Sequence, residues 1–267
     1  MPIYFQISSI YQLGSHAAIH AASVILARAL KITSKIIMLP LMLKGETEKN
    51  QHIKKKHLLT MDLQQTIPLP KLSTSKAFYL RQMWFYNFGI HCVTPDGQKP
   101  FFFNWTEDVA NRGSLEVASC LYRFCTLLKE EYEIDHLIIW SDSCAGQNKN
   151  FTLICLYQIL ILNGTFKRID HKFPEVGHSY LDSDRNFGRI EKKLRKHENI
   201  YVPEQYRDII KAASARNSVC VNMENYYLEF DKLPEMLHLF NKKKNELNEK
   251  VNFRDNIKCL RAWQLFV

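Results

Sequence analysis

The sequence predicts an α/β protein in which a mixed β-sheet is flanked by helices. Short apolar runs alternate with helical patterns after residue 57, in the order β-β-β-α-β-α-β-α. Of the 267 residues, 46% are hydrophobic and 12% aromatic, which suits a chain that buries a core and argues against a disordered one. Five core strands are expected.

Three segments are predicted along the chain. Residues 1–57 are expected to form a helical segment and linker, interpreted as a remnant, since Lys44–Lys56 is rich in charge and marks a boundary. Residues 58–206 carry the alternating pattern of the core. Residues 207–267 are expected to add an α/β extension. Cations and a proline interrupt the apolar stretch near the N-terminus, so no membrane span is expected, although an organelle presequence is an alternative.

The first half of the core is predicted to hold three antiparallel strands, at residues 57–63, residues 77–93 and from residue 101. The first is a short buried strand that ends in a carboxylate, Asp62. Pro68 and Pro70 are expected to open a loop after it, and Thr94–Gly97 has turn composition.

The second half alternates helices and strands, expected at residues 114–128 (helix), 136–140 (strand), 150–162 (helix), 168–173 (strand) and 184–196 (basic helix). Ser114 is predicted to be the N-cap of the first helix. Glu116 lies in its first turn, where a carboxylate suits the helix dipole. A role of Glu116 as an additional metal carboxylate is the alternative.

Acidic residues stand at the ends of predicted elements. Asp62 closes the first strand, Asp142 follows the fourth, and Asp184 begins the last core helix. Strands one and four are commonly neighbours in this arrangement, so their carboxylates are expected to share one crevice at the carboxyl ends. Oxygen ligands suit Mg²⁺ or Mn²⁺, which activate nucleophiles and stabilise leaving oxygens in phosphoryl transfer. Asp182 and Glu191 compete with Asp184 for the third position. Each acid taken alone is more simply a turn residue.

Polar and basic side chains surround these acids and predict contact with phosphates. They are Gln147, Asn148, Lys149, His178, Arg185, Arg189, Lys192 and Lys193. The alternatives are an ordinary polar loop, a buried hydrogen-bonding histidine and a solvated cationic helix face.

Net charge and cysteine usage restrict the partners and compartment. A formal charge of +9 favours an anionic partner, with DNA or another nucleic acid as the first candidate. The seven scattered cysteines include no C-x-x-C pair, which indicates reduced thiols and a nuclear or cytoplasmic protein.

Several strings resemble a poorly characterised domain family found in transposon-like open reading frames of animal genomes. They are Met61–Gln65, Arg112–Cys120, Trp140–Asn150 and Gly177–Glu191, within a match over about residues 58–206. That family looks like a diverged relative of ribonuclease-H-like transposase and integrase cores. The resemblance implies a ribonuclease-H-like fold with Asp62 and Asp142 as the first two acids of a triad. Asp184 would be the third, with Glu191 as the alternative.

The expected function is therefore that of a Mg²⁺- or Mn²⁺-dependent nuclease or strand-transferase core acting on DNA. Residues 1–57 show no zinc-binding or helix-turn-helix motif of the kind that precedes a complete transposase core. A catalytically silent, domesticated nucleic-acid-binding or scaffold protein is one alternative. A truncated transposon relic is the other.

Overall fold

The structure is a computed structural model that describes residues 56–73, 81–94, 97–174, 182–217, 219–227 and 258–263. The predicted N-terminal helical segment lies outside these residues, as does much of the α/β extension expected at residues 207–267. Within the described ranges, no helix has the length and apolar character needed to span a membrane.

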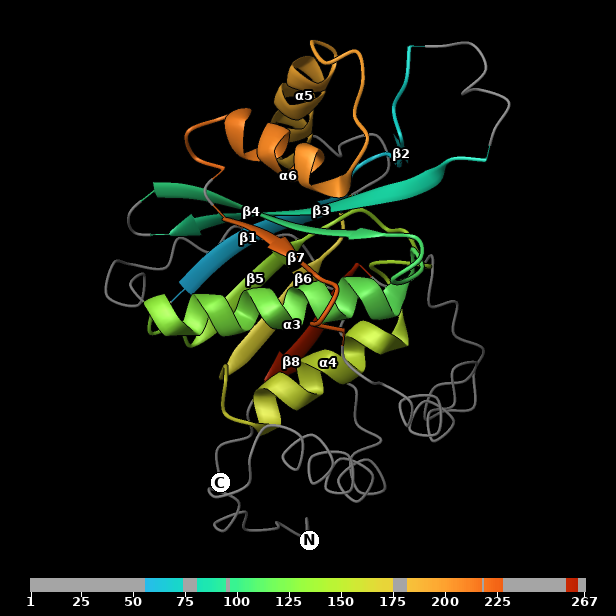
Figure 1. Cartoon of the computed structure of the whole chain (residues 1–267). Helices are drawn as coiled ribbons and strands as arrows, with labels where there is room; N and C mark the ends of the chain where they lie inside the picture. The colour runs from blue at the N-terminus through green and yellow to red at the C-terminus, as the bar shows by residue number, and fades with distance from the viewer. Residues whose placement is uncertain are drawn as a thin grey trace, which may run out of the picture.

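The described strands form one mixed sheet of eight strands (Figure 1). They are β1 (Lys56–Leu63), β2 (Ile67–Leu69), β3 (Met83–Thr94), β4 (Gly97–Thr106), β5 (His136–Trp140), β6 (Arg168–Lys172), β7 (Val219–Asn222) and β8 (Cys259–Trp263). The order is β7-β4-β3-β1-β5-β6-β8, with β2 paired to β3. Strands β1, β3 and β4 are antiparallel, whereas β1, β5 and β6 are parallel. The prediction of a mixed sheet flanked by helices is confirmed.

Three strands, β2, β7 and β8, add to the five that the sequence predicts. The loop expected at Pro68 and Pro70 is wrong in part, because Ile67–Leu69 pairs with β3 and the Pro68 carbonyl accepts a 2.6 Å hydrogen bond from the Tyr206 hydroxyl. Strand β3 also begins only at Met83. Arg81 before it is exposed and Gln82 donates to the Pro70 carbonyl, so neither joins the ladder.

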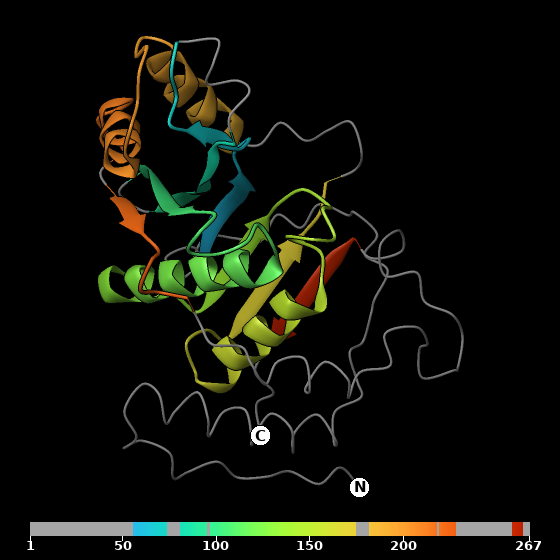
Figure 2. The ribbon, with the colours of Figure 1, turned by 45° about the vertical axis from the view of Figure 1, so that its right-hand side comes forward.

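Four described helices cover the two faces of the sheet (Figures 1 and 2). Helices α3 (Ser114–Glu131) and α4 (Phe151–Leu162) pack on one face over the larger apolar core. Helices α5 (Asp182–Leu194) and α6 (Pro203–Ala212) pack on the other face, over a second core with residues of β2, β3 and β4. The predicted core limit at residue 206 falls inside α6.

The start of α3 differs from its prediction by one residue. Ser114 is the first helical residue and Gly113 is the N-cap, while the Ser114 hydroxyl bonds the Thr152 hydroxyl of α4 at 3.0 Å. Glu116 accepts hydrogen bonds from the backbone N–H groups of Asn111 (3.1 Å) and Gly113 (2.9 Å). The Glu116 carboxylate thus provides hydrogen-bond acceptors for backbone N–H groups at the start of the helix. This agrees with the interpretation that it stabilises the helix N-terminus.

A ladder of buried amides crosses the sheet on the α5–α6 face. The Asn87 amide donates to the Gln64 side-chain oxygen at 2.8 Å, and the Asn104 amide donates to the Asn87 side-chain oxygen. Each is at most 3% exposed. Cys220 of β7 donates to the Asn104 oxygen, so the ladder joins the residue after β1 to β3, β4 and β7. Paired in this way, the buried amides avoid the cost of unsatisfied polar groups.

Candidate functional site

Strands β1 and β5 bring Asp62 and Asp142 to the same edge of the sheet. The strands are parallel, with Thr60 opposite Trp140, so Asp62 and Asp142 each follow this last pair by two residues. Asp62 lies on the α5 face of β1 and is half-buried. Its Oδ1 accepts from the Leu63 N–H at 2.8 Å. The predicted neighbourhood of the first and fourth core strands is confirmed.

Helix α5 approaches this edge because β3 offers it a glycine. Gly89 is the partner of Asp62 across the β1–β3 ladder, and a Cβ added there would lie 2.9 Å from two ring atoms of Phe187. One position before Phe187, Asn186 donates to His91 Nδ1 at 2.8 Å. These contacts hold the first half of α5 against the sheet and bring Asp184, one turn earlier, toward Asp62.

The charges of Asp142 and Asp184 both act on Asp62. Its pKa is raised from 3.8 to about 7, first by burial and then by the charges of Asp142 and Asp184. The Leu63 N–H bond and the charge of Arg112 act in the opposite direction. Glu191 does not contribute to this shift. Of the two candidates for the third acid that the structure describes, Asp184 is therefore the one whose charge reaches Asp62.

The acids suit a hard divalent cation by chemistry but are not assembled into a closed ligand set. Carboxylate oxygens are the donors that Mg²⁺ and Mn²⁺ prefer. Among the described side chains, no group of three or more His, Cys, Asp or Glu residues is arranged to hold a metal ion. Asp182 begins α5, but its side chain lies outside the described residues, as does His178.

The loop between β5 and α4 is a rigid support for Asp142. Asp142 Oδ1 accepts from the Cys144 N–H at 3.2 Å and from the Asn148 amide. Asn150 caps α4 by accepting from the Leu153 N–H at 3.1 Å. Asn148 is 1% exposed and Lys149 4%, with the Lys149 ammonium 5.2 Å from the centre of the Phe173 ring. Both side chains thus lie inside the protein in this structure, and their contact with phosphate stays a prediction. Gln147 alone of the three is partly exposed.

A buried relay behind this loop was not predicted. The Tyr157 hydroxyl donates to His171 Nδ1 at 2.8 Å, and His171 Nε2 donates to the Ser141 hydroxyl at 2.7 Å. Ser141 in turn donates to the Asp142 carbonyl at 2.9 Å. Burial lowers the pKa of His171 to about 3, so the ring is neutral at pH 7. The relay fixes the backbone of Asp142. The sequence signal that could have predicted it is His171, which occupies a core-facing position of the strand at residues 168–172.

The basic side chains of α5 share a helix with Asp184. Arg185, Arg189 and Lys192 are exposed and Lys193 is half-buried, so the expected cationic face is present. Arg189 also bonds the Asn186 side chain at 3.4 Å. Exposed cations at this position suit phosphates.

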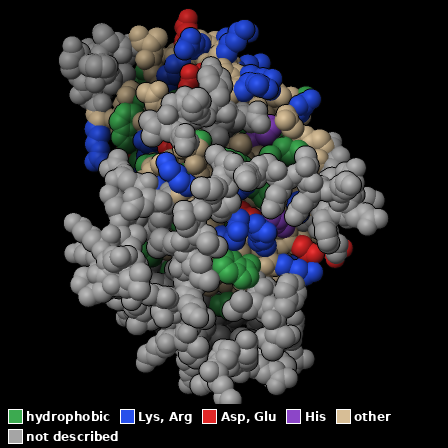
Figure 3. All heavy atoms as spheres, turned by 180° about the vertical axis from the view of Figure 1, so that it is seen from behind, with side chains coloured by type: hydrophobic (Ala, Val, Ile, Leu, Met, Phe, Trp, Pro, Cys, Tyr) green, Lys and Arg blue, Asp and Glu red, His purple; other side chains and the backbone are tan. Residues whose placement is uncertain are grey.

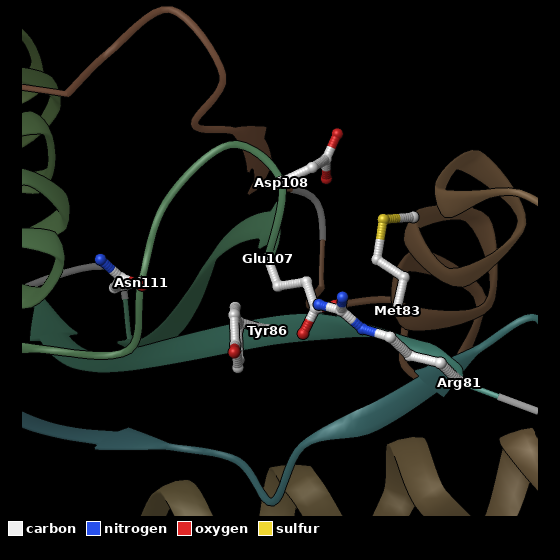
Figure 4. Close-up of a pocket in the computed structure, with 6 residues that line it drawn as sticks. All are labelled: Arg81, Met83, Tyr86, Glu107, Asp108 and Asn111. Atoms are coloured by element: carbon white, nitrogen blue, oxygen red, sulfur yellow. The ribbon is translucent and has the colours of Figure 1, made fainter.

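A cavity of about 400 Å³ opens at the carboxyl end of β4, at the same edge of the sheet as Asp62 (Figure 4). It is lined by Arg81, Met83, Tyr86, Glu107, Asp108 and Asn111. Arg81 and Glu107 form an ion pair of 3.2 Å over it. This cavity was not predicted, because its lining comes from the start of β3 and from the loop after β4.

Comparison with known proteins gives a family match and weak structural likenesses. The family described as "Domain of unknown function (DUF7869)" matches residues 80–259. None of the curated proteins matches the chain. Among solved structures, NurA bound to dAMP and manganese is 15% identical with a TM-score of 0.20, covering 84% of this chain and 46% of that chain. NurA with manganese is 12% identical with a TM-score of 0.21, covering 85% and 47%. The chain thus spans less than half of those chains, and such TM-scores do not establish a shared fold.

Proposed function

Since the chain belongs to the DUF7869 family, whose description assigns no function, we propose from its own residues that it is a transposase-like, metal-dependent nuclease or strand-transferase core acting on DNA phosphodiesters. The observation that carries the proposal is that the charges of Asp142, after β5, and of Asp184, in α5, both act on the half-buried Asp62 near the end of β1. Carboxylates that act on one another repel, and a bound cation would offset that repulsion.

A ribonuclease-H-like core is the fold we propose for the central part of the sheet. In support, β4, β3, β1, β5 and β6 follow one another in the sheet, with β1 between an antiparallel and a parallel neighbour. The third acid comes from a helix on the face opposite α3 and α4, which lets it approach the other two from the flank.

Each residue has a distinct part in this proposal. Asp62, Asp142 and Asp184 would hold Mg²⁺ or Mn²⁺, which supplies Lewis acidity and a nucleophilic oxygen when bound. The Asn148 amide and the relay through His171 hold the Asp142 side chain and backbone in place. The exposed cations of α5 orient the DNA backbone beside the acids.

The test is nicking of supercoiled plasmid by the purified full chain in Mg²⁺ or Mn²⁺. Nicking is expected, with a loss of at least a hundredfold in Asp142→Asn and in Asp62→Asn. Asp208→Asn, an exposed carboxylate on α6, is the matched control and is expected to keep activity. Binding of DNA without nicking in either metal sinks the proposal.

A catalytically silent nucleic-acid-binding protein is the second candidate. The observation that favours it is that the described acids are not arranged as a ready ligand set. Binding with steep salt dependence that is unchanged in Asp62→Asn, together with absent nicking, would select it.

A further inference from the structure

The outward side chains of β5, β6 and β8 form a surface that the acid site does not explain. These strands turn Leu137, Ile169 and Leu260 toward the core beneath α3 and α4. Their alternate residues face the other way, and among the described helices α5 and α6 pack on β1, β3 and β7 instead. We call this surface the β5–β6–β8 face. It comprises His136, Trp140, Arg168, Lys172, Arg261 and Trp263, around Asp170.

The charge on this face is positive and held in place. Three Lys and Arg side chains point outward from these strands against one carboxylate, Asp170. Asp170 is 3% exposed and bonds His136 at 2.8 Å, Arg168 at 2.8 Å and Arg261. Burial disfavours its ionised form, but these hydrogen bonds outweigh burial and lower its pKa. The carboxylate therefore stays ionised and anchors both guanidinium groups. Each guanidinium has five N–H donors, so donors remain for an outside anion.

Two tryptophans stand at opposite corners of the same face. Trp140 is half-buried, with the Lys172 ammonium 5.5 Å from its ring centre. Trp263 is 38% exposed and lies opposite Arg168 in the β6–β8 ladder. From strand spacing and rise the two residues are about 16 Å apart across the sheet. Figure 3 shows Lys and Arg side chains gathered beside a hydrophobic one in the middle of this side of the molecule.

Aromatic rings interleaved with cations fit one occupant better than others. A single strand offers bases whose faces stack on tryptophan and phosphates that pair with Lys and Arg. In a duplex the bases are already stacked on one another, so Trp263 would have no partner. Trp140 precedes Asp142 by two residues, so a strand that crosses this face reaches the acid edge directly.

We propose that the β5–β6–β8 face is a stacking platform for single-stranded nucleic acid, which it guides to Asp142. The inference rests on the proposed function, because it names the form of substrate that reaches the acids. It adds that the substrate is single-stranded next to the site, not fully paired.

The test is fluorescence anisotropy of the full chain with a labelled oligothymidine strand, an oligouridine strand and a duplex of equal length. EDTA is present, so binding is measured without cleavage. The wild type is expected to bind a single strand at least tenfold more tightly than the duplex. Trp263→Ala is expected to weaken this binding roughly five- to thirtyfold, and Trp263→Phe to keep most of it. Binding of either the oligothymidine or the oligouridine strand supports the platform. The ratio of the two affinities shows whether a DNA or an RNA strand is preferred.

Trp84→Ala is the matched control, because Trp84 is 39% exposed but lies on β3, away from this face. It is expected to bind as the wild type does. Lys172→Gln is expected to lower the slope of log affinity against log salt by about one. If Trp263→Ala unfolds, quenching of wild-type tryptophan fluorescence by oligouridine replaces it, and absent quenching overturns the platform.

Two failures can be told apart. Equal binding by Trp263→Ala and wild type, or tighter binding of the duplex, overturns the platform even where plasmid nicking succeeds. Normal single-strand binding through Trp263, with no nicking in Mg²⁺ or Mn²⁺, overturns the proposed function and leaves the platform standing.

Discussion

Replacing Asp62 by Asn is expected to stabilise the metal-free protein at neutral and higher pH. Asp62 is half-buried and lies in the field of two further acids, Asp142 and Asp184. Asparagine keeps the shape of the side chain and an oxygen that can accept from the Leu63 N–H, but it carries no charge. The substitution therefore removes the repulsion and the cost of burying the charge while leaving the packing almost unchanged.

The magnitude follows from the pKa of Asp62. A rise from 3.8 to about 7 corresponds to about 4 kcal/mol between the ionised and neutral forms. Solvent reaches part of this side chain, so about 2 kcal/mol is the expected gain.

The pH window follows from the sign of that shift. Well below pH 3.8 the carboxyl is protonated in both folded and unfolded chains, and the substitution has little effect on stability. Between pH 4 and pH 7 the folded chain binds more protons than the unfolded chain at this group, so wild-type stability falls as the pH rises. Above pH 7 the full penalty is present.

Urea unfolding of wild type and Asp62→Asn in EDTA, from pH 4.5 to pH 8.5, measures the difference directly. Subtracting the two curves cancels every other titrating group. Asp208→Asn on α6 is the control, with a difference expected to stay near zero throughout. A difference that is flat across this range, or Asp62→Asn being less stable than wild type at pH 8, refutes the reasoning.

Three further predictions concern the supports of the site. Gly89→Ala is expected to cost about 1–3 kcal/mol in urea unfolding and to reduce nicking, because its Cβ would meet the Phe187 ring at 2.9 Å and displace α5. His171→Phe is expected to cost about 1–3 kcal/mol, because Tyr157 and Ser141 each lose a buried partner. Glu116→Gln is expected to cost about 1 kcal/mol in thermal unfolding, through weaker bonds to two backbone N–H groups, with the Mn²⁺ dependence of nicking unchanged.

Each of these has a contrary result. If Gly89→Ala folds with wild-type stability, the contact between Gly89 and the Phe187 ring does not determine how closely α5 packs on the sheet. If His171→Phe is more stable than wild type, the relay is not a support of the loop. A changed metal optimum in Glu116→Gln would place that carboxylate among the metal ligands.

The positions of Asp62 and Asp142 near strand ends were predictable from local pattern, whereas their role stays a prediction. Asp62 and Asp142 each follow an apolar run, and parallel strands in one sheet present their carboxyl ends at one edge. The contact between Gly89 and Phe187 was not predictable, because the two residues are far apart in the sequence. Such a contact produces no periodic pattern of apolar residues. Strand β8 is separated from its partner β6 in the same way.

The roles of buried polar residues were the least predictable. Asn148 and Lys149 look like surface residues by composition, yet they are buried by the turn that carries Asp142. Ser114 was predicted to be the N-cap, but the N-cap is Gly113, one residue earlier. The Ser114 hydroxyl instead bonds the Thr152 hydroxyl of α4. In both cases a tertiary contact outweighs a local preference.

The amide ladder through Gln64, Asn87 and Asn104 has a consequence for strand alignment. Side chains alternate along a strand, so a slip of β1 by one position would turn Asp62 toward the opposite face. The same slip would leave the Gln64 and Asn87 amides buried without partners, at a cost that apolar neighbours cannot offset. The ladder therefore favours one register of β1 against β3, the register in which Asp62 faces α5.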